Sequence, residues 1–296
     1  MDNDLVLWDR LEVIKTTINK YGEDNFYLSF SGGKDSTVVH YLLDMALPGN
    51  KIPRVFSNTG IEYIYIYMFV KELQKNDERF EIITPNKNIR KMLEEVGYPF
   101  KSKEHSVMVH EWQVGHRETN KMKRYLSETE HRYVCPKSLR YQFTDQFDLK
   151  VSSKCCYELK KKVFKKWEKE NNRRITITGM MREEGGERTH IDCIMVKNGK
   201  AVKFHPLAKV NSEWEGWFIK EYNIKLCDLY YPPFNFKRTG CKGCPYSLDL
   251  SDQLETMSRC GLESERRQCE IIWKPVYDEY RRIGYRLKNE ERIKLF

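Results

Sequence analysis

The chain has 296 residues, 40% of them hydrophobic and 32% charged, with a formal net charge of +9. This composition is typical of a soluble globular protein, and no run of about 18 apolar residues is present that would indicate a membrane span. The N-terminal stretch "MDNDLVLWDRLEVIKTTINKYG" has mixed charge and lacks the features of a secretory signal peptide. We therefore expect a cytoplasmic protein with no membrane partner.

The first third of the chain alternates predicted strands and helices. Apolar residues at helical spacing predict a leading helix within residues 1–22. Three apolar runs then predict strands at 25–30, 54–60 and 80–85, followed in turn by helices at 36–47, 61–74 and 88–97. Repeated strand–helix pairs need crossover connections. The expected fold is therefore α/β, a parallel twisted sheet with helices on both faces in a Rossmann-like arrangement.

The remainder of the chain predicts one more strand, a hairpin and a helical end. A strand is expected at 173–181, and Asn198-Gly199 marks a hairpin turn within 194–207. Residues from about 100 to 150 predict helices and loops that cover one end of the sheet. We expect one domain over 1–250 with a helical C-terminal extension over 251–296.

The stretch "SFSGGKDST" places two glycines between the first strand and its helix. Gly32 and Gly33 permit positive φ, so that backbone N–H groups can converge on an oxyanion. The helix that follows directs its positive dipole end to the same point. Lys34 adds a mobile charge, Asp35 can hold Mg²⁺, and Ser36 can cap the helix or bind phosphate. The turn is suited to phosphate.

Several segments together resemble a known family. The sequence "SGGKDS" resembles the pyrophosphate loop of the PP-loop ATP pyrophosphatase (adenine nucleotide α-hydrolase) superfamily, and "NTG" after the second strand resembles an element lining the adenosine pocket there. The segments "GMMREEGGER", "KFHPLAKVNSEWEGWFI", "DLYYPPF" and "TGCKGCP" then follow the order of the phosphoadenosine phosphosulfate (PAPS) reductase family, over about residues 25–250. The resemblance implies that an adenine nucleotide, with Mg²⁺ if it is ATP, binds at Ser31, Gly32, Gly33, Lys34, Asp35, Ser36, Asn58, Thr59 and Gly60.

Two departures from this family bear on the reaction. Met181 stands where the family usually has an arginine, so Arg182 and Arg188 are both candidates to contact an anionic group. Family members that reduce adenylyl sulfates tend to lack the loop lysine. The intact loop, with Lys34 and Asp35 as candidate catalytic residues, therefore resembles that of an ATP user more closely.

Four of the nine cysteines form a pattern with metal-binding potential. Cys155-Cys156 is followed far along the chain by Cys241-Lys-Gly-Cys244-Pro. Thiolates suit iron–sulfur clusters or zinc, and a CxxC turn can direct two sulfurs to one centre. The combination resembles the [4Fe–4S] site of assimilatory adenylyl-sulfate reductases, with a structural zinc site as the alternative.

A fifth cysteine is a candidate nucleophile. Adenylyl-sulfate reductases carry one in a C-terminal ECGLH-like tail, and Cys260-Gly261-Leu262 matches part of it, although no histidine follows. Cys135 is a second candidate for sulfur handling. The segment 154–174 has nine Lys or Arg against three Glu, which suits either a solvated helix face or a nucleic-acid surface.

Three functions remain open. The first is ATP-dependent adenylation coupled to sulfur transfer, with a nucleic acid among the candidate acceptors; the second is reduction of adenylyl sulfate or PAPS to sulfite; the third is a non-catalytic nucleotide sensor or scaffold. Candidate partners are a sulfur-donor protein or thioredoxin-like reductant and a second copy of the chain. The intact loop favours the first function.

Overall fold

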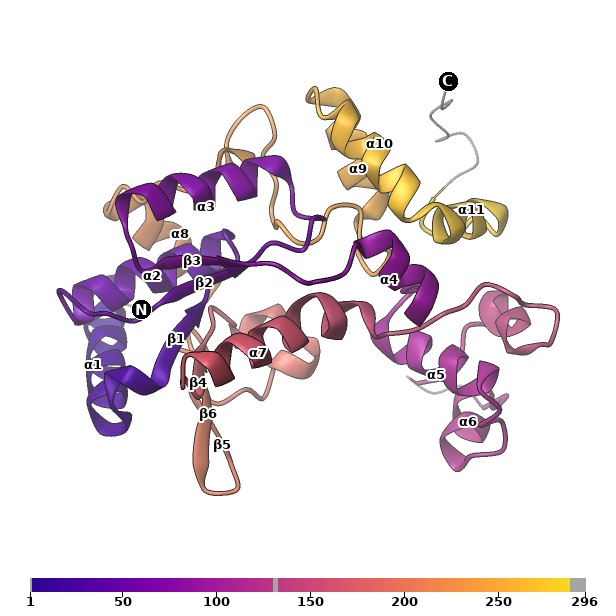
Figure 1. The fold of residues 1–296 in the computed structure, drawn as a ribbon, viewed down its shortest axis with the longest axis horizontal. Coiled ribbons are helices and arrows are strands. Elements are labelled where there is room, and N and C mark those ends of the chain that lie inside the picture. The colour runs from indigo at the N-terminus through magenta and orange to yellow at the C-terminus, as the bar shows by residue number, and fades with distance from the viewer. Residues whose placement is uncertain (1, 130–132, 288–296) are drawn as a thin grey trace. The chain divides into compact units, whose positions relative to one another are not determined.

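The computed structural model describes residues 2–129 and 133–287 (Figure 1). The chain divides into two compact units. The sheet unit comprises the residues up to Asn58, Glu62–Thr84 and Val163–Gly240; the cysteine unit comprises Thr59–Ile61, Pro85–Lys162 and the residues from Cys241 onward. Among the described residues, no helix is both long and apolar enough to cross a bilayer.

The sheet unit is built on six strands in the order β3-β2-β1-β4-β6-β5. All neighbouring pairs are parallel except β5 and β6, which form the expected antiparallel hairpin around Asn198-Gly199. The strands are β1 Phe26–Ser29, β2 Arg54–Ser57, β3 Phe80–Ile83, β4 Ile175–Ile177, β5 Ile194–Lys197 and β6 Lys200–Phe204. The predicted mostly parallel α/β fold is confirmed, and β4 is shorter than the predicted strand 173–181.

Helices cover both faces of this sheet. Figure 1 shows α2 and α3 on one face and α7 on the other. The helices are α1 Asn3–Tyr21, α2 Lys34–Ala46, α3 Ile64–Asn76, α7 Lys162–Glu170 and α8 Ser212–Glu221. Both crossovers, β1–α2–β2 and β2–α3–β3, step in the same direction along the sheet, so right-handed connections place α2 and α3 on the same face.

The alternation of side chains along β1 explains the two-sided core. Tyr27 points to the α7 face, where its ring lies 5.0 Å from Trp167 and 5.9 Å from Phe164, measured between ring centroids. Phe30 lies on the α2 side and meets His40 edge-on. Successive residues of a strand face opposite ways, so both faces of a short strand must be apolar when helices cover both. This accounts for the nearly continuous apolar run at residues 25–30.

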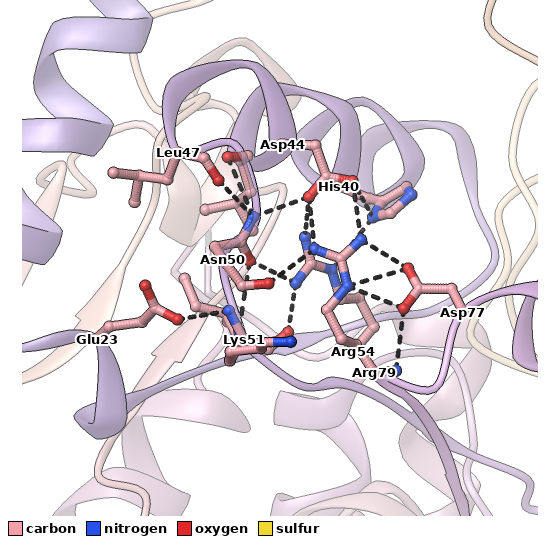
Figure 2. Close-up of polar contacts among 11 residues, drawn as sticks. Glu23, His40, Asp44, Leu47, Asn50, Lys51, Arg54, Asp77 and Arg79 are labelled. Atoms are coloured by element: carbon pink, nitrogen blue, oxygen red, sulfur yellow. Dashed lines mark hydrogen bonds and ion pairs between the residues drawn. The ribbon is translucent and has the colours of Figure 1, made fainter.

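At the amino ends of β2 and β3, a buried polar network joins the strands to α2 (Figure 2). Arg54 is fully buried. Its guanidinium donates to Asp44 Oδ1 at 2.7 Å, to Asn50 Oδ1 at 2.7 Å and to His40 Nδ1 at 3.1 Å. Arg79 also binds Asp44, with Nη1 2.7 Å from Oδ1. Every nitrogen of the Arg54 side chain therefore has an acceptor, which is what burial of a guanidinium requires.

The cysteine unit is helical. Its helices are α4 Ile89–Val96, α5 Lys103–Gln113, α6 Asn120–Tyr125, α9 Leu250–Arg259, α10 Glu263–Ile272 and α11 Lys274–Arg282, with a π-helical turn at Tyr157–Lys161. The predicted helix at 88–97 and the helical pattern beyond residue 250 are confirmed as far as the described residues extend. Its core includes His105, whose ring nitrogens bond Tyr125 and Gln142.

Candidate functional site

The glycine-rich turn links the carboxyl end of β1 to the start of α2. Gly32 has φ of +71°, and a Cβ there would lie 2.8 Å from Ile66 Cγ2 of α3. Both its conformation and its surroundings therefore require glycine. Gly33 is extended, with φ −82° and ψ 163°, and α2 begins directly after it at Lys34. The N-terminus of α2 thus opens at the carboxyl edge of the sheet, where ligands of parallel α/β folds bind.

Hydroxyl groups hold this turn in shape. The Oγ atoms of Ser31 and Ser36 lie 3.0 Å apart, and Ser31 Oγ accepts from the N–H of Gly33. Ser36 Oγ and Thr37 Oγ1 both donate to the Gly33 carbonyl, at 2.9 and 3.0 Å. The loop is therefore preformed by its own side chains, which lowers the entropic cost of ligand binding.

The segment after β4 passes close behind the loop. A Cβ at Gly179 would lie 2.7 Å from the carbonyl carbon and oxygen of Asp35. This glycine opens the "GMMREEGGER" segment and lets two backbone stretches, distant in sequence, lie against each other. Its position explains why the segment belongs to the same site as the loop.

The loop lysine lies between two carboxylates. Lys34 Nζ is 3.2 Å from Asp35 Oδ1 and contacts Glu215 Oε2 from α8. Burial lowers the pKa of Lys34, but the two acidic groups outweigh it and raise that pKa overall. Burial raises the pKa of Glu215 to about 7; the charge of Asp35 adds to the rise and Lys34 opposes it. Lys34, Asp35 and Glu215 thus form one cluster of charged side chains at the loop.

A cavity of about 580 Å³ opens beside these groups. Besides Lys34, Asp35 and Glu215, its charged and phenolic lining comprises Glu183, Glu184, Lys237, Arg238 and Tyr230. Tyr230 Oη accepts from the Lys34 N–H at 3.1 Å and bonds Thr239 Oγ1 at 2.8 Å. Residue patterns did not identify Glu215, Tyr230 or Arg238, although all three lie within or next to the segments quoted above.

The two arginine candidates point to different surroundings. Arg182 Nε donates to the Ile191 carbonyl at 2.7 Å, and its side chain lines a second cavity of about 500 Å³ beside Lys209 and Trp214. Arg188 pairs with Glu184, one of the buried carboxylates of the first cavity. The structure therefore places neither arginine among the residues that line the first cavity; Met181 does line it.

The adenosine-pocket candidates follow β2. Asn58 comes directly after the strand, and its N–H donates to the Ile83 carbonyl of β3 at 2.8 Å, so it lies at the same sheet edge as the loop. Thr59 is buried, and Gly60 has φ of +82°. Thr59 and Gly60 belong to the cysteine unit.

The four cysteines of the proposed cluster all belong to the cysteine unit. Burial raises the pKa of Cys155, and the charges of Cys241, Cys156 and Cys244 raise it further, while Lys160 lowers it. Burial raises the pKa of Cys244 to about 12, with a further contribution from Cys241. The charges of the other three cysteines therefore all act on the Cys155 thiol. Within the described residues, no three His, Cys, Asp or Glu side chains are arranged to hold a single metal ion.

The CxxC turn is held by the C-terminal helices. Trp273 Nε1 donates to the Lys242 carbonyl at 3.1 Å, and the Tyr277 and Tyr280 hydroxyls donate to the carbonyls of Gly243 and Pro245. These three aromatic residues have no measurable exposure. The segment beyond residue 250 therefore contributes a rigid support for Cys241 and Cys244.

The two candidate nucleophiles differ in environment. Cys260 is partly exposed at the C-terminal end of α9, and α10 begins three residues later. Cys135 is buried, and burial raises its pKa to about 11 despite the opposing charge of Lys101. A thiol with such a pKa is protonated at neutral pH and is a poor nucleophile.

The family match covers the part of the chain that contains the motifs quoted above. Residues 25–247 match the family model described as the phosphoadenosine phosphosulfate reductase domain. Among solved structures, PAPS reductase from Candida auris shares 12% identity over 78% of this chain and 93% of its own, with a TM-score of 0.44. The NH3-dependent NAD synthetase of Campylobacter jejuni shares 12% over 93% and 95%, also with a TM-score of 0.44.

A third solved structure, the tRNA thiolase NcsA of Methanococcus maripaludis with its [4Fe–4S] cluster, shares 14% identity over 98% of this chain and 83% of its own, with a TM-score of 0.41. No curated protein sequence matches the chain significantly.

Proposed function

The chain belongs to the phosphoadenosine phosphosulfate reductase domain family, and from this premise we propose that it is an ATP-dependent enzyme of sulfur chemistry. In this proposal ATP binds on residues 31–36, an acceptor oxygen attacks the α-phosphorus, and the bond to the β-phosphate breaks to release pyrophosphate. The terminal sulfur of a persulfide on a donor protein then attacks the adenylated atom of the acceptor and displaces AMP, which leaves with the acceptor oxygen. A thiol reductant cleaves the remaining sulfur–sulfur bond, so that sulfur stays on the acceptor and the donor cysteine is released as a thiol.

The observation that carries this proposal is the position of Lys34. Its ammonium lies beside the preformed loop and lines the cavity into which α2 opens. Charge that builds on the β- and γ-phosphates as pyrophosphate leaves can be stabilised by this ammonium and by the N-terminal dipole of α2. A sulfonucleotide, which has no β–γ pyrophosphate at this place, gives the lysine no such role.

A cluster on Cys155, Cys156, Cys241 and Cys244 forms part of the proposal. Four cysteine thiols, of which Cys241 and Cys244 lie on a CxxC turn supported by Trp273, match the number and type of donors that a [4Fe–4S] cluster requires. When bound, the cluster supplies a centre that holds sulfur or carries electrons. Lys160 offsets part of the negative charge of four thiolates.

Sulfonucleotide reduction is the second candidate, because the cysteine pattern also suits it. That reaction needs a nucleophilic thiolate that can reach the sulfur atom. Cys260 is followed by α10 and α11, and Cys269 of α10, Tyr277 of α11 and Trp273 between the two helices are buried. The segment is thus a packed part of the cysteine unit, which favours the ATP reaction over one that uses a cysteine on a tail.

A nucleic acid is the acceptor that we propose. The turn and helix at 157–170 expose the lysines Lys161, Lys162, Lys165, Lys166 and Lys169. Clustered lysines bind phosphates in a salt-dependent way. Loss of binding to single-stranded RNA and DNA when three of these lysines are changed to glutamine would support this acceptor class; equal binding would argue against it.

The test of the reaction is a turnover assay on anaerobically prepared protein. ATP is offered with single-stranded RNA or DNA as the acceptor, and adenylyl sulfate and PAPS are each offered with a thiol reductant. Pyrophosphate and sulfite are measured in every reaction. We expect pyrophosphate from ATP and no sulfite from the other two. Sulfite that disappears in Cys260→Ser but persists in Cys227→Ser, a buried control, would overturn the proposal in favour of the reductase.

A further inference from the structure

The cysteine unit contains a cavity of about 920 Å³ that the proposed reaction does not use. One wall is the face of α11 that carries Asp278, Glu279 and Arg282. Further lining residues come from the 3-10 helix Lys137–Phe143 and from the segment 144–150 that follows it. All of the lining residues belong to the cysteine unit, so no residue of the glycine-rich loop takes part.

The guanidinium of Arg282 is fixed in this cavity by two neighbours. Its Nε and Nη2 donate to the two carboxylate oxygens of Glu279, each at 2.7 Å. Its central carbon lies over the Tyr141 ring, 4.9 Å from the ring centroid, and the Tyr141 hydroxyl donates to the same carboxylate. Nevertheless, 58% of the Arg282 side chain is exposed. A planar cation is thus held against an aromatic ring while much of its surface stays accessible.

The charges that line the cavity largely cancel one another. The guanidinium and its carboxylate partner form a neutral pair, and Asp278 is paired with Lys274 one turn earlier in α11. The other charged lining residues are Asp148 and Lys150, one acidic and one basic, and both are exposed. This balance favours neither a run of phosphates nor a multiply charged cation. The cavity therefore suits a ligand without net charge.

The uncharged lining provides flat surfaces and hydrogen-bonding groups. Tyr98 and Phe147 are half-buried aromatic residues, and the Phe147 ring meets the Tyr141 ring edge-on at 5.6 Å between centroids. Thr144 and Gln146 add exposed polar side chains. A nucleobase is a planar, uncharged ligand with hydrogen-bonding edges, and it stacks on aromatic rings and on the plane of an arginine.

We propose that this cavity binds a nucleobase, which stacks on the accessible side of the Arg282 guanidinium while the polar side chains of the cavity meet its edge. Because Glu279 and Tyr141 already hold the guanidinium, little conformational entropy is lost when a base stacks on it. The base can belong to a single strand or to a free nucleoside. The inference goes beyond the ATP reaction and does not depend on it.

The test uses the full chain and 2-aminopurine, a base whose fluorescence is quenched when it stacks. The probe is offered at the centre of a single strand of abasic residues, and separately as the free riboside. We expect the wild type to quench the probe and to bind this strand about 10-fold more tightly than a fully abasic strand. Arg282→Lys, which keeps the charge and removes the plane, should abolish both the quenching and the preference.

The matched control is Arg259→Lys, an exposed arginine of α9 that also pairs with a glutamate one turn away and does not line the cavity. It should behave as the wild type does, and thermal unfolding of each variant verifies the fold. Tighter binding of the strand than of the riboside assigns the cavity to nucleic acid, and the reverse order assigns it to a free nucleoside.

Two results would overturn the inference: equal affinity of the wild type for the two strands, or equal quenching by Arg282→Lys and the wild type. In either case the proposed ATP reaction stands, because it is measured separately by pyrophosphate release. Failure of pyrophosphate release, with quenching that depends on Arg282, would overturn the proposed reaction and leave the nucleobase site in place.

Discussion

The two ends of the parallel sheet each carry a basic side chain among acidic ones, and they differ in how completely the protein satisfies it. At the amino ends, Arg54 donates from all three nitrogens to Asp44, Asn50, His40 and the Ile52 carbonyl (Figure 2). At the carboxyl ends, Lys34 shares two carboxylates, and Glu215 keeps an oxygen without a partner in the described chain. A closed network stabilises the fold, whereas an incomplete one can accept a ligand.

The largest expected effect is on the closed network. Arg54→Leu removes a fully buried guanidinium, leaves the Asn50 side-chain oxygen without its guanidinium donor and leaves Asp44 with Arg79 as its remaining cationic partner, so we expect a loss of about 3–5 kcal/mol in the free energy of unfolding. Urea unfolding followed by circular dichroism measures it. Arg79→Leu, at a more exposed position, should cost less. A loss below about 1 kcal/mol for Arg54→Leu would show that the network is not what holds α2 to β2.

At the carboxyl ends of the strands, removal of the basic side chain should weaken ligand binding and should change the free energy of unfolding little. Lys34→Met should weaken binding of an ATP analogue, with a methylene group in place of the α–β bridging oxygen, about 100-fold, because a charge-assisted contact contributes roughly 1.5–3 kcal/mol. Stability should change little, because Glu215, whose pKa is already raised to about 7, becomes protonated. Calorimetric titration measures the affinity.

The control is Lys225→Met, an exposed lysine of the sheet unit paired with Glu72. If Lys34→Met and Lys225→Met bind the analogue with equal affinity, Lys34 does not contribute to ligand binding, and the contrast between the amino and carboxyl ends of the sheet is wrong.

The smallest expected effect is a pH dependence of the free energy of unfolding, which arises from His40 in the Arg54 network. Burial and the charge of Arg54 lower the pKa of His40 to about 4, whereas an unfolded chain has a histidine pKa near 6.5. The unfolded state therefore binds more protons between these values, and stability falls as pH decreases through this window. We expect His40 to account for at most about 2 kcal/mol between pH 7.5 and pH 5.

His40→Asn, which keeps an acceptor for Arg54, should flatten the pH dependence of unfolding by this amount. Parallel curves for the variant and the wild type would show that His40 does not titrate in this way.

The loop and the sheet could be predicted from the sequence because both depend on local patterns. Apolar runs followed by amphipathic helices correctly predicted β1 to β3 and their helices, and the Asn198-Gly199 turn predicted the hairpin. The start of α2 at Lys34 was harder to predict from the sequence. The residue before it, Gly33, is the N-cap and has an extended backbone, and it has no side chain that would mark the start of a helix.

Glu215 and Tyr230 could not be predicted because their roles arise from packing. In the sequence "SEWEGW", nothing distinguishes Glu215 from the other polar residues. Only the packing of α8 brings it into contact with Lys34, which lies 181 positions earlier in the chain. The support of the CxxC turn by Trp273 and Tyr277 is similarly non-local. Their helices were predicted, but nothing in their spacing indicates what they hold. The assignment of Cys155, Cys156, Cys241 and Cys244 to a cluster remains a prediction.

A substitution at Gly179 should inactivate this site. Gly179 has no side chain, and the backbone of Asp35 occupies the space that one would fill, 2.7 Å from the position of a Cβ. An added methyl group would displace the backbone of the glycine-rich loop while leaving every charged group, hydroxyl and cysteine in the chain intact. A Gly179→Ala allele would therefore allow genetics to separate two questions in a living cell: whether the host needs this protein to be present, and whether it needs the chemistry that we propose for the loop.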